Sequence, residues 1–250
     1  MLKKRLIISL TFNEGVLFRT KMFYPDYRYT KNFVDLWNAD EIILIDVSKK
    51  EKKLEDNFLK IIKFFIENCH LPITVGGGIS STEVAKKIFD LGVEKIIVNS
   101  STYENPKITS DLVKTFGSSS IIQAIDFKKV NGMEYTIKIN NGKKKIDKDI
   151  DEYIKFILSL NVGEIFFNSI DNDGGLMGFD LNLINKFSKK IDVPIIVQGG
   201  GGNWNHFYEV LKLKNISAAC TQNIYHFTEA SLKSAKKFLS SKNILVRYDN

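Results

Sequence analysis

The feature that most constrains the fold is an alternation of short apolar runs with helical patterns along the whole chain. Each run is nearly continuous and rich in β-branched residues, as is typical of parallel strands that are covered on both faces. The predicted strands are Leu6–Leu10, Ile42–Asp46, Ile73–Val75, Lys95–Asn99, Ile121–Asp126, Glu164–Asn168, Ile195–Gln198 and Ser217–Thr221. This alternation predicts repeated βα units of the α/β class.

Eight such units in 250 residues predict one (β/α)8 TIM barrel that spans residues 1–250 as a single domain. The alternative is an open, doubly wound parallel sheet. Helical apolar spacing predicts helices over 58–66 and 150–158. Another helix is predicted to start at Ser80, with Glu83 completing a capping box, and to end at Gly92.

A weak internal repeat divides the chain into two halves. Three pairs of segments correspond: Asp40–Ile43 with Gly163–Phe166, Gly76–Gly78 with Gly199–Gly201, and Arg5–Phe12 with Ser120–Phe127. The repeat predicts two similar half-barrels of four units each. Two such halves would carry two equivalent ligand sites at the carboxyl ends of the strands.

Charge and hydropathy narrow the possible functions. The net charge is +7, mostly from lysines such as those in Lys49–Lys53 and Lys143–Lys148, but no nucleic-acid motif accompanies them. No apolar run reaches the roughly 18 residues of a membrane span. The apolar run after Arg5 is too short for a signal peptide, so we expect a cytoplasmic protein. Cys69 and Cys220 lack metal-type spacing and are expected to be free thiols.

Two glycine-rich turns follow predicted strands, Gly76–Gly78 and Gly199–Gly202. Glycine lets the backbone approach a ligand closely, and a phosphate gains the exposed N–H donors of such a turn. The first site would be completed by Asn99 and Ser100, and the second by Asp173, Gly174 and Asn223. The turns therefore predict phosphate binding, although tight turns without a ligand are the simpler alternative.

Carboxylates also stand at strand ends: Asp46, Asp126, Asp171 and Asp173. A carboxylate at the carboxyl end of a barrel strand is more often catalytic than structural. Asp126 is the best candidate for a general acid or base, because flanking apolar residues would raise its pKa. A hydrogen-bonding loop aspartate is the alternative. Its repeat mate, Thr11, cannot carry a proton in the same way.

Charged residues begin four strands, Arg5, Glu41, Lys95 and Glu164. They would all lie at the opposite, amino-terminal face and could form a ring of ion pairs, since unpaired charges inside a barrel are costly. On the residues alone, a stabilising polar plug is the favoured interpretation. His206 and His226 lack the neighbours of metal ligands, so no metal or other cofactor is expected.

Together these residues resemble a known family, the cyclase subunit of imidazole glycerol phosphate synthase (HisF), over nearly the whole chain. The resemblance rests on Met1–Arg5, Asp40–Ile42, Thr74–Ile79, Glu94–Ile96, Phe116–Ser118, Ala124–Asp126, Gly163–Ile165, Ser169–Asp171, Asp173–Gly174 and Tyr225–Phe227. It implies a bis-phosphorylated nucleotide substrate and a glutaminase partner whose ammonia passes through the barrel.

The resemblance also implies roles for single residues. The charged ring would be the gate for ammonia, and Asp126 would be one of two catalytic aspartates. Phosphate-site positions are matched by Gly78, Asn99, Ser100, Asp173, Gly174 and Gly200.

Departures from the family pattern cluster where the chemistry would occur. Thr11 replaces the other catalytic aspartate, Arg19 replaces a lysine, Gln198 replaces a serine, and Thr221–Asn223 replaces small residues. This pattern resembles divergent paralogues that act with a glutaminase and a third protein to amidinate a sugar of a bacterial surface polysaccharide. Asn168–Asp171 and Arg19–Phe23 favour that branch. A genuine imidazole glycerol phosphate synthase and a non-catalytic ammonia conduit are the alternatives.

Overall fold

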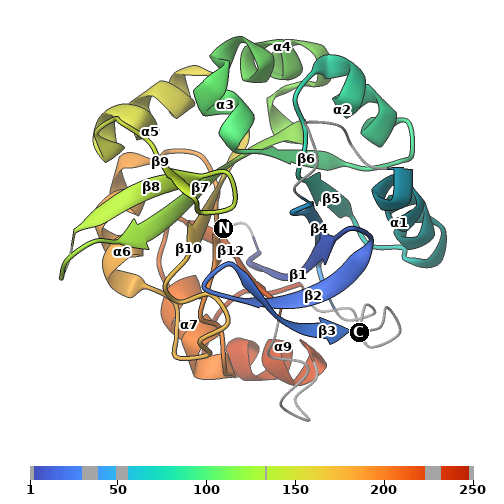
Figure 1. Ribbon diagram of the computed structural model, residues 1–250. Coiled ribbons are helices and arrows are strands. Elements are labelled where there is room, and N and C mark those ends of the chain that lie inside the picture. Colours follow the sequence, from blue (N-terminus) through green and yellow to red (C-terminus); the bar gives the residue numbers. More distant parts are fainter. Residues whose placement is uncertain (1–2, 30–38, 49–55, 133, 223–231, 248–250) are drawn as a thin grey trace.

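The computed structural model describes residues 3–29, 39–48, 56–132, 134–222 and 232–247, and it forms a barrel of parallel strands ringed by helices (Figure 1). The barrel strands are β1 (Arg5–Asn13), β4 (Glu41–Asp46), β5 (Ile73–Gly76), β6 (Lys95–Val98), β7 (Ile121–Lys129), β10 (Glu164–Ser169), β11 (Ile195–Gln198) and β12 (Ile216–Thr221).

Each strand pairs in parallel with the next, and β12 pairs with β1, so the sheet is closed. The predicted barrel is thus confirmed, and the open-sheet alternative is wrong. All eight predicted strands are present, with ends that differ by a few residues, as hydrophobic patterns do not define strand ends sharply.

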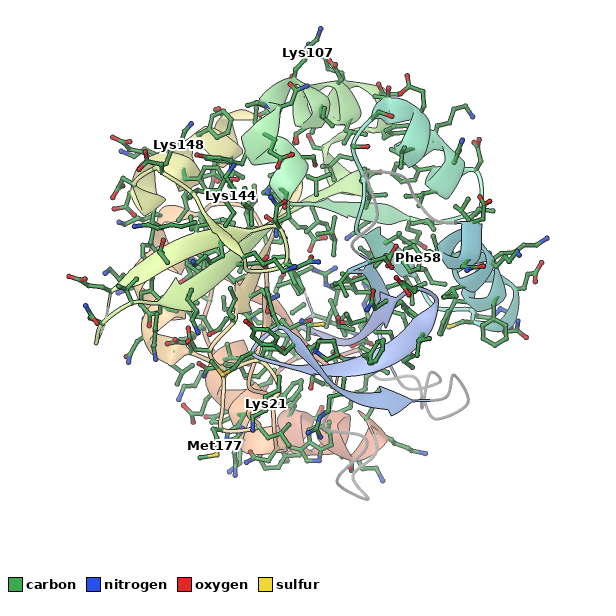
Figure 2. The ribbon with its side chains drawn as sticks, viewed as in Figure 1. Lys21, Phe58, Lys107, Lys144, Lys148 and Met177 are labelled. Carbon is green, nitrogen blue, oxygen red and sulfur yellow. The ribbon has the colours of Figure 1, made fainter. Side chains whose placement is uncertain are left out.

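The outer layer consists of helices that follow the strands. They are α1 (Asp56–Asn68), α2 (Thr82–Phe89), α3 (Ser100–Glu104), α4 (Pro106–Phe116), α5 (Ile150–Ser159), α6 (Leu181–Phe187), α7 (Trp204–Leu211) and α9 (Leu232–Ser241), with 3-10 turns at Ser118–Ser120 and Ser188–Lys190. Each long helix buries one apolar face on the barrel; Phe58 of α1 is an example (Figure 2).

One predicted helix boundary is wrong. Ser81, not Ser80, is the N-cap of α2, because its hydroxyl accepts a hydrogen bond from Val84 N. The helix ends at Phe89, and Gly92 follows with φ +101°. Ser80 and Ser81 are equally good capping residues, and only the path of the chain decides between them.

Two hairpins stand at corresponding places in the two halves. β1 and β7 are the longest strands, and each continues past the barrel to pair antiparallel with a following strand. β1 pairs with β2 (Val16–Lys21), which pairs with β3 (Tyr24–Tyr29). β7 pairs with β8 (Tyr135–Ile139), which pairs with β9 (Lys144–Lys145). The shared device agrees with the predicted half-barrel repeat, and both hairpins lie across the barrel in Figure 1.

The buried residues form two clusters. The larger lies between strands and helices, and the smaller fills the barrel interior. Lys107, Lys144 and Lys148 are exposed, and Figure 2 shows Lys107 at the outer edge of the helical layer. Lys49–Lys53 lies outside the described residues. Within the described part of the chain, no helix is long and apolar enough to cross a membrane.

Candidate functional site

The amino-terminal ends of the strands carry the predicted charged ring. Arg5 Nη1 lies 2.8 Å from Glu41 Oε2, and Arg5 Nη2 donates to Glu164. Glu164 also accepts from Lys95 Nζ, so it bridges both cations. Thr74 Oγ1 donates to Glu41 Oε1 at 2.7 Å. The four charges therefore meet as predicted, and each acid has a cationic partner.

The electrostatics of the ring follow from this pairing. Burial alone would lower the pKa of Arg5, but the charges of Glu41 and Glu164 outweigh it and raise that pKa. Burial would likewise raise the pKa of Glu164, yet Arg5 and Lys95 lower it. Arg5 and Glu164 are therefore charged near neutral pH, and the ring is a polar layer in which each acid is paired with a cation.

An apolar layer lies directly above the ring, inside the barrel. It consists of inward-facing residues that are all less than a tenth exposed: Ile7, Ile43, Ile97, Ile122, Ala124, Phe166, Ile196, Ala218 and Cys220. Phe166 is the only aromatic side chain among them. The layer separates the charged ring from the polar groups at the carboxyl ends of the strands.

Asp126 is the central polar group at those carboxyl ends. It is 6% exposed, and Asn99 Nδ2 and Asn168 Nδ2 donate to its two oxygens at 2.7 and 3.3 Å. Burial raises the pKa of Asp126 to about 7; the two amide hydrogen bonds oppose the rise and the nearby charge of Asp173 adds to it. A group with this pKa can accept or donate a proton near neutral pH.

Thr11 occupies the matching position in the first half. Its Oγ1 lies 3.5 Å from Gln222 Oε1, and Gln222 Nε2 donates to the carbonyl of Phe18 on β2. A hydroxyl and a carboxamide thus stand where the family resemblance implies a second carboxylate. The sequence did not predict the contact between Gln222 and Thr11 or the hydrogen bond from Asn168 to Asp126. The inward-facing position of Asn168 on β10 was a signal that could have predicted its contact with Asp126.

The first glycine turn is open at Gly78 but not at Gly77, where a Cβ would lie 2.1 Å from the carbonyl oxygen of Asp46. Gly78 is exposed with φ +64°, and a Cβ built on it would meet no atom within 4 Å. Nearby, Ser100 Oγ accepts a hydrogen bond from Asn140 N at 2.9 Å. This turn has the free approach that a phosphate needs, although its occupancy stays a prediction.

The second glycine turn is closed by its neighbours. A Cβ on Gly200 would overlap the carbonyl oxygen of Gly178, and one on Gly202 would overlap that of Leu176. The cavity beside this turn measures about 10 Å³ and includes Gln198 in its wall. Close backbone packing therefore explains these glycines without a ligand.

Asp173 and Gly174 attach to the first hairpin. Asp173 Oδ2 accepts from Phe23 N at 3.1 Å, its carbonyl accepts from Met22 N at 3.0 Å, and a Cβ on Gly174 would overlap Thr20 O. Burial raises the pKa of Asp173, although the charge of Arg19 on β2 opposes the rise. Their phosphate role stays a prediction, and Asn223 lies outside the described residues.

The other strand-end aspartates are engaged locally. Asp46 Oδ1 accepts from Ser48 N at 3.0 Å and also from its hydroxyl. Asp171 pairs with Lys128 Nζ and accepts from Lys129 N. Both therefore stabilise turns after their strands, which leaves Asp126 as the carboxyl group poised for proton transfer.

The described residues contain no cluster of His, Cys, Asp and Glu that could hold a metal ion. His206 Nδ1 accepts from Gly202 N at 3.2 Å, and its pKa is lowered by burial, whereas His226 lies outside the described residues. Cys69 and Cys220 are free and buried, as predicted.

A larger cavity of about 590 Å³ lies at the amino-terminal face, away from Asp126. Its wall includes Ser118, Asn161, Gly163 and Lys190, all in loops that precede barrel strands. It therefore opens on the same end of the barrel as the charged ring.

The fold and the site define an α/β-barrel protein with a charged ring at one end of the barrel and a buried, proton-active carboxyl group at the other. The profile of the histidine biosynthesis protein family matches residues 11–231, so the chain belongs to that family.

Its relatives are HisF proteins over nearly the whole length. The imidazole glycerol phosphate synthase subunit HisF of Hydrogenobaculum sp. (strain Y04AAS1) is 33% identical over 264 residues, which cover 99% of this chain and all of the relative. The HisF subunit of Bacillus cereus (strain G9842) is 32% identical with the same coverage. A putative HisF subunit of Leptospira borgpetersenii is 36% identical over 90% of this chain and 91% of its own.

Proposed function

We propose that this chain is the ammonia-using synthase subunit of a glutamine amidotransferase and that a glutaminase docks at its amino-terminal face. The observation that carries the proposal is the alignment, along one barrel, of a neutralised charged ring, an apolar layer and Asp126. The ring and the large cavity lie at the docking end. The relatives, all named as HisF subunits, support the assignment of a synthase subunit.

The apolar layer sets which form of the nitrogen could pass. An ammonium ion entering it would lose its hydration at a penalty of several kcal/mol. Neutral ammonia carries the smaller penalty of an uncharged polar group, so transfer would deliver ammonia. Asp126, with a pKa of about 7, is placed to take the proton that the nitrogen releases when it attacks a substrate carbon.

The substrate is proposed to be a sugar of a bacterial surface polysaccharide, amidinated with the help of a third protein. Two observations favour it over the histidine pathway. Thr11 with Gln222 supplies no second carboxylate, and the second glycine turn encloses only about 10 Å³. Loss of one acid or base typically lowers a rate by two to four orders of magnitude.

The first experiment is turnover of the bis-phosphorylated histidine-pathway nucleotide by the purified chain with excess ammonium salt. Free ammonium removes the need for the glutaminase. We expect no turnover by the folded protein and no rescue of a histidine auxotroph. Robust turnover would establish a genuine imidazole glycerol phosphate synthase and refute the sugar assignment.

The conduit alternative is tested with Asp126→Asn. In the complete pathway, we expect amidination to fall about 100-fold or more, because the proton acceptor is lost. A non-catalytic conduit would instead keep its full pathway flux. Thermal unfolding of the variant checks that the barrel is intact.

A further inference from the structure

Two buried acceptors without partners lie side by side at the carboxyl end of the barrel. Among the residues that the structure describes, Asn168 Oδ1 and Gln198 Oε1 have no hydrogen-bond partner, and Asn168 is 6% exposed. Asn168 on β10 and Gln198 on β11 are direct partners in the parallel register. A buried polar atom without a partner is unusual and calls for an explanation, which a small bound molecule can supply.

The side chains of Asn168 and Gln198 point toward the barrel interior. Phe166 and Ile196 belong to the interior cluster, and Asn168 and Gln198 follow them by two residues, on the same face of each strand. The Asn168 amide group donates to Asp126, so its carbonyl oxygen is left for another partner. The next strand in the register carries Asp126 itself, opposite Asn168.

Chemistry and size restrict the occupant. The free atoms accept hydrogen bonds, so the occupant must donate them, whereas a phosphate near neutral pH presents mainly acceptor oxygens. The cavity beside Gln198, which Asp173 and Gln222 also line, measures about 10 Å³ and has room for one water-sized molecule; Asn168 adjoins it through its pairing with Gln198. Ammonia is of that size and has three N–H donors.

We propose that Asn168 and Gln198 form a receiving site for ammonia, which they hold beside Asp126 after it leaves the apolar layer. The inference rests on the proposed function, because it presumes that ammonia travels through the barrel. The isoleucines of the layer offer neutral ammonia no acceptor; the acceptors with free capacity beside it are the buried hydroxyl of Ser9 and, immediately above the layer, the carboxamide oxygens of Asn168 and Gln198. Asn168 and Gln198 are thus positioning residues that bring the nucleophile to the proton acceptor.

Binding is tested without any reaction by following the side-chain amide NMR signals of Asn168 and Gln198. Ammonium chloride is compared with potassium chloride at equal ionic strength, because potassium is similar in size but has no hydrogen-bond donors. We expect a saturable shift of both signals with ammonium alone. Equal effects of the two salts, or no saturable shift, would mean a water site only and overturn the proposal.

Three near-isosteric variants complete the binding test. Asn168→Leu and Gln198→Met should each weaken ammonium binding about five- to tenfold, as expected for one lost hydrogen bond. Asn215→Leu is the matched control: its amide group already donates to the carbonyl of Ser188, at the amino-terminal end of β12, so the ammonium response should persist. Equal loss in all three variants would contradict a site built by Asn168 and Gln198.

A kinetic test separates this inference from the proposed function. In the ammonium-dependent reaction of the full complex, Gln198→Met should raise the KM for ammonium about five- to tenfold and change kcat little. Ammonium-dependent turnover with an unchanged KM would refute the receiving site and leave the proposed function standing. Specific ammonium binding without any ammonium-consuming reaction would refute the proposed function instead.

Discussion

At the scale of single residues, Asp126 shows how position creates reactivity. Its carboxyl group is that of any aspartate, but the barrel removes it from water and places two amide groups where they donate hydrogen bonds to it. Burial outweighs these hydrogen bonds, and the pKa rises to about 7. Flanking apolar residues predicted the direction of this shift, whereas Asn99 and Asn168 as partners required the tertiary structure.

This shift predicts a pH dependence of stability. The folded pKa of about 7 exceeds the ordinary value of 3.8 for an aspartate in water, so the folded state binds an extra proton between these pH values. The free energy of unfolding should therefore fall as pH rises from 4 to 7, by on the order of 1 kcal/mol for each unit of difference. Asp126→Asn should lack this decline in urea unfolding at several pH values; parallel curves for both proteins would contradict it.

Glu164 carries the opposite prediction, because Arg5 and Lys95 lower its pKa. Glu164→Gln should reduce the free energy of unfolding at pH 7 by roughly 3 kcal/mol, since two largely buried cations lose a partner. The deficit should shrink as pH falls through the lowered pKa of Glu164. Glu164→Gln should also impair glutamine-dependent activity more than ammonium-dependent activity.

An exposed ion pair supplies the control for Glu164. Glu209 pairs with Lys212 on the surface, where both side chains are more than 40% exposed. Glu209→Gln should change the free energy of unfolding by less than about 1 kcal/mol. An equal effect of the two substitutions would show that the ring is no more stabilising than a surface pair.

At the scale of elements, Gly200 and its repeat mate Gly77 are both closed by a backbone carbonyl, whereas Gly78 of the first turn faces open space. Gly200→Ala should destabilise the protein by more than about 2 kcal/mol, because φ is +103° and a Cβ would overlap Gly178 O. Gly78→Ala meets open space and should lose only about 1 kcal/mol for its positive φ. Urea unfolding of both variants measures the contrast, and equal losses would contradict the closed second turn.

At the scale of the whole molecule, the barrel interior is a stack of three layers: the charged ring, the apolar layer and the polar groups at the carboxyl ends of the strands. Phe166 is the largest side chain of the apolar layer. Phe166→Ala should lower the free energy of unfolding by about 3–5 kcal/mol, because a cavity opens in a close-packed interior. Phe166→Leu should lose less, since it keeps most of the volume. Calorimetry of both variants tests the ranking; equal losses would mean that the layer collapses around either residue.

The sequence by itself determined the architecture and the opposed ends of the barrel. Apolar periodicity specifies βα units whatever their partners, and strand direction alone puts Arg5 and Glu164 at one end and Asp126 at the other. Only the tertiary structure decided which groups meet across strands. Packing closes the turn at Gly200, brings Thr11 into contact with Gln222 and places Asn168 beside Gln198. These contacts join residues that are far apart in the chain. They depend on strand register and burial, which local sequence patterns do not encode.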